Sequence, residues 1–339
     1  MVAVSSLVWL AATLESDPGK IVGPISKLFG IVLNFIFNIV YSITPSHSMG
    51  ISIILLTIFV RILMIPLAVK QQKSMFVMRK LQPEMRKIQD KYKDMLEDPE
   101  AKRKMNMEMQ GLYTKFKYNP FSGCLPMIIQ LPIFIGLYYV MRNPYQFIDE
   151  IYELYKQIGN VFIENASFES MQDFAVNIVK PMLPQNDVNI NILNVDDLVK
   201  VLDKLNAGNW EIFKGYLPDG SINSLLERKD SINAFLGLNL SAMPDEVIIP
   251  NIAIPIISGF TTYLSGWLMT RKNQAADPAV KTQQRIMNIT MPLFMAYVTF
   301  RVPCGVGLYW TTSNVFQIVQ YMFLNKHYEK RMSEEGTKM

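Results

Sequence analysis

Arg61 is the residue whose type and position point most clearly to chemistry. It lies near the middle of residues 51–69, which are otherwise almost entirely apolar. An arginine at the centre of a membrane helix costs about 2.5–3.5 kcal/mol, so it is rarely found there without a role. Its apolar neighbours contribute roughly 0.3–0.6 kcal/mol each, so the helix can still insert if the guanidinium faces protein or water. We therefore expect Arg61 to face a wet cavity.

A structural ion pair is the alternative for Arg61, but the apolar stretches of the chain contain no Asp or Glu to supply a partner. Thr57 lies one helical turn earlier and falls on the same face. Further polar residues interrupt later apolar stretches, and together they could line one groove with Arg61. Each alone more commonly forms an interhelical hydrogen bond. They are Gln130, Ser313, Asn314 and Gln317.

The elements that must position these residues are apolar helices. Half of the 339 residues are apolar and only 18% are charged, a balance typical of membrane proteins. About 20 apolar residues in a helix cross a hydrocarbon core of about 30 Å. The sequence predicts an all-α polytopic membrane protein with five transmembrane helices, at residues 50–70, 120–142, 248–270, 286–300 and 303–325.

Charge placement predicts the orientation of these helices. Residues 70–117 carry thirteen Lys or Arg against seven acids, whereas residues 143–247 carry sixteen acids against seven Lys or Arg. Cytosolic loops are enriched in Lys and Arg, so the first segment should be cytosolic and the second external. Five spans then place the N-terminus outside and the C-terminus in the cytosol. We expect a multi-pass protein of a bacterial plasma membrane.

The segments outside the spans are predicted to be mostly helical. Residues 20–45 carry an amphipathic stripe that suits a helix lying in the outer interface, and a further true span is the alternative. Residues 143–247 read as an acidic, α-rich external insertion of unknown role. The remaining segments are an N-terminal arm, a cytosolic hairpin, a cytosolic loop and a cytosolic tail, at residues 1–19, 71–118, 271–285 and 326–339.

The cytosolic hairpin should turn near Asp98 and Pro99. Its apolar residues recur at helical spacing, which favours packing of the two helices on each other. The flexible methionine side chain also suits a surface that meets many different apolar sequences. The candidate contact residues are Met75, Met78, Met85, Met105 and Met109. The basic outer face could contact anionic lipids or ribosomal RNA, although a solvated, topology-setting face is the commoner role for a single lysine.

No catalytic or metal-binding pattern is present in the sequence. His47 and His327 are far apart in the chain, and Cys124 and Cys304 lack metal-ligand spacing. No Gly-rich phosphate loop occurs. The net charge of +4 is segregated along the chain, as topology demands, and does not point to DNA. We expect a protein that is not an enzyme and needs no cofactor or metal.

Three long segments carry a family resemblance. TIFVRILMIPLAVKQQKSM at 57–75, NPFSGCLPMIIQLPIFIGLYYVMR at 119–142 and MPLFMAYVTFRVPCGVGLYWTTSNVFQIVQ at 291–320 resemble the shared core of the YidC/Oxa membrane protein insertase family. The chain lacks a large domain before the arginine span, so it resembles the Gram-positive YidC type. The long acidic segment 143–247 departs from that type.

The resemblance implies a hydrophilic groove that is open to the cytosol and the lipid. Arg61, Thr57, Gln130 and Trp310 match groove positions of the family, and relatives have substrate-contacting aromatic residues where Tyr309 and Trp310 lie. Packing is the alternative for both aromatic residues. The implied function is an insertase and chaperone that passes hydrophobic segments of nascent membrane proteins from the cytosol into the bilayer. The ribosome, a Sec translocon and anionic lipids are further candidate partners.

Two other classes of function stay open at this point. An anion or solute transporter could use Arg61 as its binding site, although the repeated halves common in transporters are not evident in this sequence. A structural assembly factor would hold other membrane complexes together and would not depend on Arg61.

Overall fold

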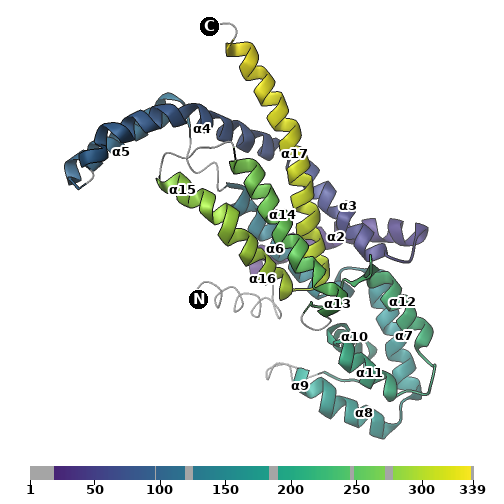
Figure 1. Ribbon diagram of the computed structural model, residues 1–339. Helices are drawn as coiled ribbons and strands as arrows, with labels where there is room; N and C mark the ends of the chain where they lie inside the picture. The colour runs from purple at the N-terminus through teal and green to yellow at the C-terminus, as the bar shows by residue number, and fades with distance from the viewer. Residues whose placement is uncertain are drawn as a thin grey trace. The chain divides into compact units, whose positions relative to one another are not determined.

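The computed structural model describes residues 19–95, 97–118, 125–182, 190–244, 248–271 and 278–336 (Figure 1). The described chain is almost entirely helical, and its only strands form a two-residue antiparallel ribbon. Two of its helices are long and apolar enough to cross a membrane, and a bent helix pair is a third candidate. These features agree with the predicted all-α membrane protein. The predicted N-terminal arm lies outside the described residues except for Gly19.

The chain divides into two compact units. Unit 1 comprises residues 1–56, 132–254 and 299–309, and unit 2 comprises residues 57–131, 255–298 and 310–339. Five helices contribute residues to both units. They are α3 (Ser48–Leu63), α6 (Leu125–Arg142), α14 (Ala253–Thr270), α16 (Met291–Phe300) and α17 (Cys304–Gly336).

Unit 1 contains a small helical domain, here named the insertion subdomain, built from residues 143–244. Its helices gather in one bundle in Figure 1. Its elements are η3 (Pro144–Gln146), α7 (Asp149–Asn165), α8 (Phe168–Phe174), η4 (Ala175–Val179), α9 (Lys180–Met182), α10 (Val195–Lys204), α11 (Ala207–Gly215), α12 (Asn223–Asn233), β1 (Ala234–Phe235) and β2 (Leu238–Asn239).

Three helices of the insertion subdomain, α8, α10 and α11, begin at polar capping residues, and the subdomain has an aromatic core. Asn194 caps α10 by accepting hydrogen bonds from two backbone N–H groups, which stabilises a helix start by about 1 kcal/mol. Phe162, Phe174 and Phe213 are fully buried, with ring centroids 4.9–5.2 Å apart. The predicted α-rich insertion is thus a packed domain in the structure.

Helix α2 (Gly19–Ile43) packs on this subdomain through polar contacts. Asn34 donates to Asp149 at 2.8 Å and accepts from the Asp149 backbone N–H at 3.2 Å. Arg228 of α12 donates to the Tyr41 hydroxyl at 2.8 Å and pairs with Glu150. An apolar stripe on α2 stays exposed at helical spacing, formed by Leu28, Ile31, Phe35, Ile39 and Ile43.

Unit 2 begins with the end of α3 and continues into the hairpin. The predicted continuous helix at 50–70 is instead two helices, α3 and α4 (Ile65–Tyr92), bent by 59° at Met64. Pro66 lies in the first turn of α4, where it has no backbone N–H for a continuing helix and clashes with the preceding turn. The first turns of α4 therefore turn away from the axis of α3.

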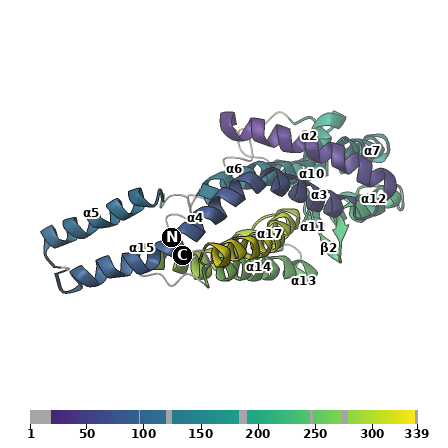
Figure 2. The same cartoon turned by 90° about the horizontal axis from the view of Figure 1, so that it is seen from above.

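The hairpin turns near Asp98 and Pro99. Helix α4 is followed by η1 (Lys93–Met95), and α5 (Pro99–Lys115) runs back along it (Figure 2). Asp98 caps α5 by accepting from the Glu100 N–H at 2.9 Å. Its core holds Met78, Leu81, Met85 and Met109.

The remaining helices of unit 2 pack through small residues. Gly266 lies so close to η5 (Ile286–Thr290) that a Cβ atom there would be 2.9 Å from the Met287 carbonyl oxygen. Such close approach is typical of helix pairs in membranes. Unit 2 also contains the short helix α15 (Pro278–Arg285), within the predicted loop 271–285, whereas the short helix α13 (Ile248–Asn251) belongs to unit 1. Helix α17 runs to Gly336, beyond the predicted end at 325, because residues 326–335 contain no Gly or Pro.

Candidate functional site

Arg61 is held by α17. Its Nε donates to the Ser313 hydroxyl oxygen at 2.7 Å, and its Nη2 contacts the same oxygen. Ser313 is 1% exposed, so its position is fixed by packing. The partner in both contacts is a neutral hydroxyl group. The structure thus brings together two residues that the sequence assigned to one groove.

Three further polar residues of α17 form hydrogen bonds with α14. Trp310 donates from Nε1 to the Thr262 hydroxyl at 2.9 Å. The Asn314 amide lies 3.1 Å and 2.9 Å from the hydroxyl oxygens of Thr261 and Thr262. Ser265 donates to Oε1 of Gln317 at 3.2 Å. These contacts are interhelical hydrogen bonds, the alternative to a groove role for such residues, and through them α14 and α17 form a polar seam (Figure 2 shows the two helices side by side).

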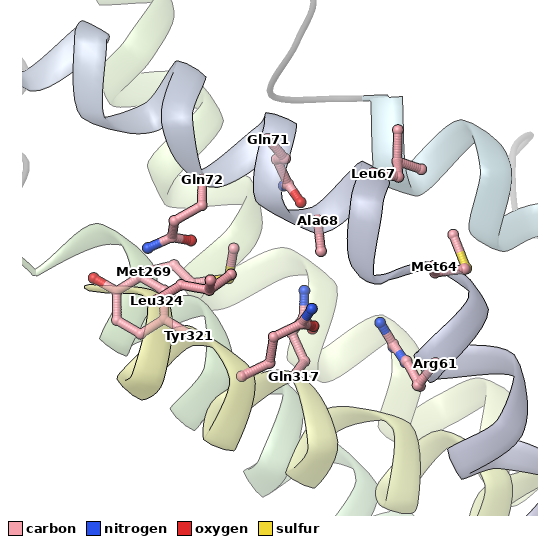
Figure 3. Close-up of a pocket in the computed structure, with 11 residues that line it drawn as sticks. Arg61, Met64, Leu67, Ala68, Gln71, Gln72, Met269, Gln317, Tyr321 and Leu324 are labelled. Atoms are coloured by element: carbon pink, nitrogen blue, oxygen red, sulfur yellow. The ribbon is translucent and has the colours of Figure 1, made fainter. Parts of the chain in front are cut away.

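A cavity of about 40 Å³ lies beside this seam. Figure 3 shows Arg61, Gln71, Gln72 and Gln317 directed into it from α3, α4 and α17. Space of 10–15 Å³ is needed for one buried water, so the cavity could hold about three. Its lining is Arg61, Met64, Leu67, Ala68, Gln71, Gln72, Met269, Gln317, Gln320, Tyr321 and Leu324.

Only Arg61 and Gln317 of the predicted groove residues line this cavity. Thr57 is fully buried in α3, and Gln130 is half-buried in α6. Tyr309 is 3% exposed and belongs to unit 1. A groove role for these three residues therefore stays a prediction.

Several cavity residues were not found from the sequence. Gln71 and Gln72 open the hairpin segment and were assigned to the cytosol, whereas Gln320 and Tyr321 continue the polar spacing of α17 by one more turn. Gln320 and Tyr321 lie three and four residues after Gln317, so the helical spacing of the polar residues predicts that they share its face. The bend at Met64 brings Gln71 and Gln72 to the cavity, and no sequence pattern predicts that bend equally clearly.

The hairpin methionines divide into two groups. Met78, Met85 and Met109 are packed inside the hairpin, as the packing alternative expected. They cannot meet a passing segment while the hairpin is closed. Met75 and Met105 are half-buried and stay candidate contacts. Met95 and Met107 are 54% and 63% exposed and were not selected from the sequence.

Two carboxyl groups outside the cavity have pKa values that are shifted from the ordinary ones. Burial raises the pKa of Asp203 in α10 well above its ordinary value, and Arg142 and Lys204 oppose part of that shift. On the hairpin, the hydrogen bond from Lys91 lowers the pKa of Glu108. Within the described residues, no three His, Cys, Asp or Glu side chains gather closely enough to hold a metal ion.

The fold and the cavity define a helical membrane protein whose polar side chains, one arginine among them, meet between apolar helices. Known proteins with similar sequences identify its family. The sequence model described as "60Kd inner membrane protein" matches residues 39–195 and 220–331. The chain belongs to this family.

Curated relatives agree with that assignment. A Clostridium acetobutylicum protein named "Membrane protein insertase YidC" is 30% identical over 302 residues, which cover 88% of this chain and 83% of the relative. Proteins of the same name from Oceanobacillus iheyensis and Clostridium perfringens are 26% and 28% identical. They cover 82% and 93% of this chain, and 74% and 96% of their own lengths. The resemblance seen in the sequence is confirmed.

Proposed function

We propose that this chain is a membrane protein insertase, which passes hydrophobic segments of other proteins from the cytosol into the bilayer of a bacterial membrane. The family match and the insertase names of its relatives support this function. The observation that carries the mechanism is Arg61, which lines the cavity of unit 2 and is held by the Ser313 hydroxyl.

The mechanism is physical. A wet cavity within the membrane shortens the apolar barrier that a polar flanking segment must cross. Arg61 attracts acidic residues in that segment, and the attraction is stronger here than in bulk water because the surrounding dielectric is lower. The apolar segment then moves into lipid, driven by its own hydrophobicity. No covalent step is needed.

The proposed topology has five spans with the N-terminus outside. They are α3 with the start of α4, then α6, α14, η5 with α16, and the first two thirds of α17, following the predicted bounds 50–70, 120–142, 248–270, 286–300 and 303–325. The hairpin then faces the cytosol and the insertion subdomain faces outward. A membrane-impermeant maleimide should label a Lys214→Cys variant on intact cells but not Lys93→Cys, both in a background lacking the native cysteines. The reverse pattern would overturn the orientation.

Helix α2 is proposed to lie in the outer interface, although it is long and apolar enough to span. Asn34, near its middle, exchanges two hydrogen bonds with Asp149, and Tyr41 accepts from Arg228. Both partners belong to the acidic insertion subdomain, which would have to enter the bilayer if α2 crossed it. The exposed apolar stripe of α2 would contact lipid instead.

Nascent membrane proteins are the substrates that this function requires. We further propose that the basic hairpin contacts anionic lipids or the ribosome, since its charge is concentrated outside its methionine core. Cooperation with a Sec translocon is a separate proposal, which rests on the family resemblance alone.

The test is insertion of a single-span substrate with an acidic tail into liposomes that contain the purified protein. Arg61→Ala should lower the insertion rate at least tenfold, because it removes the only charge lining the cavity. Arg61→Lys should retain most of it. Lys214→Ala, which removes an exposed positive charge of α11 in the insertion subdomain, is the control and should behave as wild type.

Other outcomes would redirect the interpretation. Failure of wild type to insert the substrate would favour the transporter or the assembly factor. Insertion that is indifferent to both Arg61 substitutions would leave an insertase whose mechanism does not use this arginine.

A further inference from the structure

Four glutamines line the cavity of unit 2, Gln71 and Gln72 from α4 and Gln317 and Gln320 from α17. Figure 3 labels the first three: the side chains of Gln71 and Gln317 point toward each other, and Gln72 lies beside Tyr321. Gln72 is only 7% exposed. The Nε2 atom of Gln320 is buried and has no hydrogen-bond partner within the described part of the chain. A buried donor of this kind calls for a partner that binds there.

The chemistry of the lining selects the class of ligand. Each glutamine amide offers a donor and an acceptor and carries no charge. Charge enters only through Arg61 at one end of the lining, because the remaining lining residues are neutral. The Tyr321 hydroxyl already accepts from Arg79 at 3.0 Å. The set of neutral amides is complementary to another amide, which also has one donor and one acceptor.

The size of the cavity fits the same ligand. Its volume of about 40 Å³ is that of a few waters, and one peptide group can take their place. Met64 and Met269 contribute flexible apolar walls that can adapt to side chains of different size. The site therefore suits recognition of a main chain with little regard for sequence.

We propose that this glutamine cavity binds main-chain amide groups of an extended polypeptide, namely the polar segment that flanks a substrate's apolar span. The inference rests on the proposed insertase function and deepens it. An extended segment that leaves water has unpaired N–H and C=O groups, because no helix or sheet satisfies them. The glutamine amides replace the lost water for whatever sequence passes.

The experiment compares two synthetic single-span peptides in liposomes containing the full-length protein. One peptide has a glycine-rich polar flank, and the other has sarcosine in place of each glycine, which removes the main-chain N–H groups and keeps every side chain. Wild type should insert the glycine peptide about threefold to tenfold faster than the sarcosine peptide, the range expected for one net hydrogen bond or slightly more.

The double substitution Gln72→Met with Gln320→Met removes the amides at nearly constant volume. It should insert both peptides at the same reduced rate, because the lost donor and acceptor can no longer distinguish them. Gln82→Met is the matched control. Gln82 lies in the same helix, is 8% exposed and also has an unpartnered Nε2 among the described residues, but it does not line the cavity. It should keep the wild-type ratio.

Each outcome bears on the proposal. A double variant that retains the wild-type ratio between peptides, or loses both activities in equal proportion, would overturn it and leave a water-filled cavity. If the glutamines instead bound polar side chains of the flank, wild type would insert the two peptides at equal rates, since sarcosine leaves the side chains unchanged. Wild type that inserts neither peptide would instead overturn the proposed insertase function itself.

Discussion

The aromatic core of the insertion subdomain and the cavity of unit 2 are opposite solutions to placing side chains inside a protein. In the first, the rings of Phe162, Phe174 and Phe213 pack against one another, one pair stacked and two pairs edge to face, and these side chains have no polar atom to satisfy. In the second, glutamine amides surround a space of about 40 Å³, and Nε2 of Gln320 is buried without a partner among the described residues. The first arrangement stabilises the fold. The second leaves a donor available for a ligand, and an unsatisfied buried donor lowers the free energy of unfolding by about 1–3 kcal/mol.

The largest effect on stability is expected from a substitution in the aromatic core. Phe213→Ala should lower the free energy of unfolding of the insertion subdomain by about 3–5 kcal/mol, because it leaves a cavity among fully buried rings. The rate of proteolysis of the purified protein in detergent reports this opening. Phe168→Ala, at an 82% exposed position, should change it by less than about 0.5 kcal/mol. Equal effects of the two substitutions would refute the proposed core.

A smaller effect is expected where unit 2 packs through glycine. In Gly266→Ala the new methyl would lie 2.9 Å from the Met287 carbonyl oxygen and 3.0 Å from Oδ1 of Asn288. Overpacking of this kind typically costs about 1–3 kcal/mol, seen as a lower midpoint of thermal unfolding in detergent. Gly111→Ala has open space around its Cβ in α5 and should instead stabilise the hairpin slightly. A neutral Gly266→Ala would show that α14 and η5 do not pack this closely.

The insertion subdomain itself contains one exception to its apolar design. Both carboxylate oxygens of Asp203 are buried without hydrogen bonds in the described structure. Arg142, Lys204, Tyr145 and Tyr155 are the charged or titratable groups that interact with it electrostatically. Burial raises its pKa above 3.8, so the folded state favours the protonated form.

The sign of the resulting pH dependence follows from that shift. Asp203 contributes most to stability below its ordinary pKa of 3.8, and this contribution is lost as pH rises from there through the raised folded pKa. Asp203→Asn should therefore stabilise the subdomain at pH 7 by roughly 1–2 kcal/mol and flatten the pH profile of its unfolding. A variant that is less stable than wild type at pH 7 would show that the carboxylate is ionised and paired.

The sequence predicts most where the signal is local. The hairpin turn follows from a capping Asp98 directly before Pro99, and both act within one helical turn. The polar seam of α17 follows from residues spaced three and four apart. The aromatic core does not, because its three rings come from α7, α8 and α11, and no local pattern pairs them. Gln71 and Gln72 escaped prediction because the bend at Met64 decides what they face.

The smallest expected effect concerns the hairpin surface, where Glu108 accepts from Lys91 at 2.6 Å and from the Tyr92 hydroxyl at 2.8 Å. The lowered pKa of Glu108 means that the pair stabilises the hairpin above pH 4.5 and loses this contribution as pH falls. Both charges are solvent-exposed, so salt should screen the attraction.

Glu108→Gln should accordingly leave the thermal midpoint at pH 7 and 0.15 M salt nearly unchanged, with a small decrease that appears only at low ionic strength. The amide can still accept from Tyr92, which is 8% exposed and carries the packing at this position. A large decrease at 0.15 M salt would mean that this pair, and not the core of Met78, Leu81, Met85 and Met109, holds α4 and α5 together. The hairpin would then resemble neither the aromatic core nor the cavity, because surface charge would set its stability.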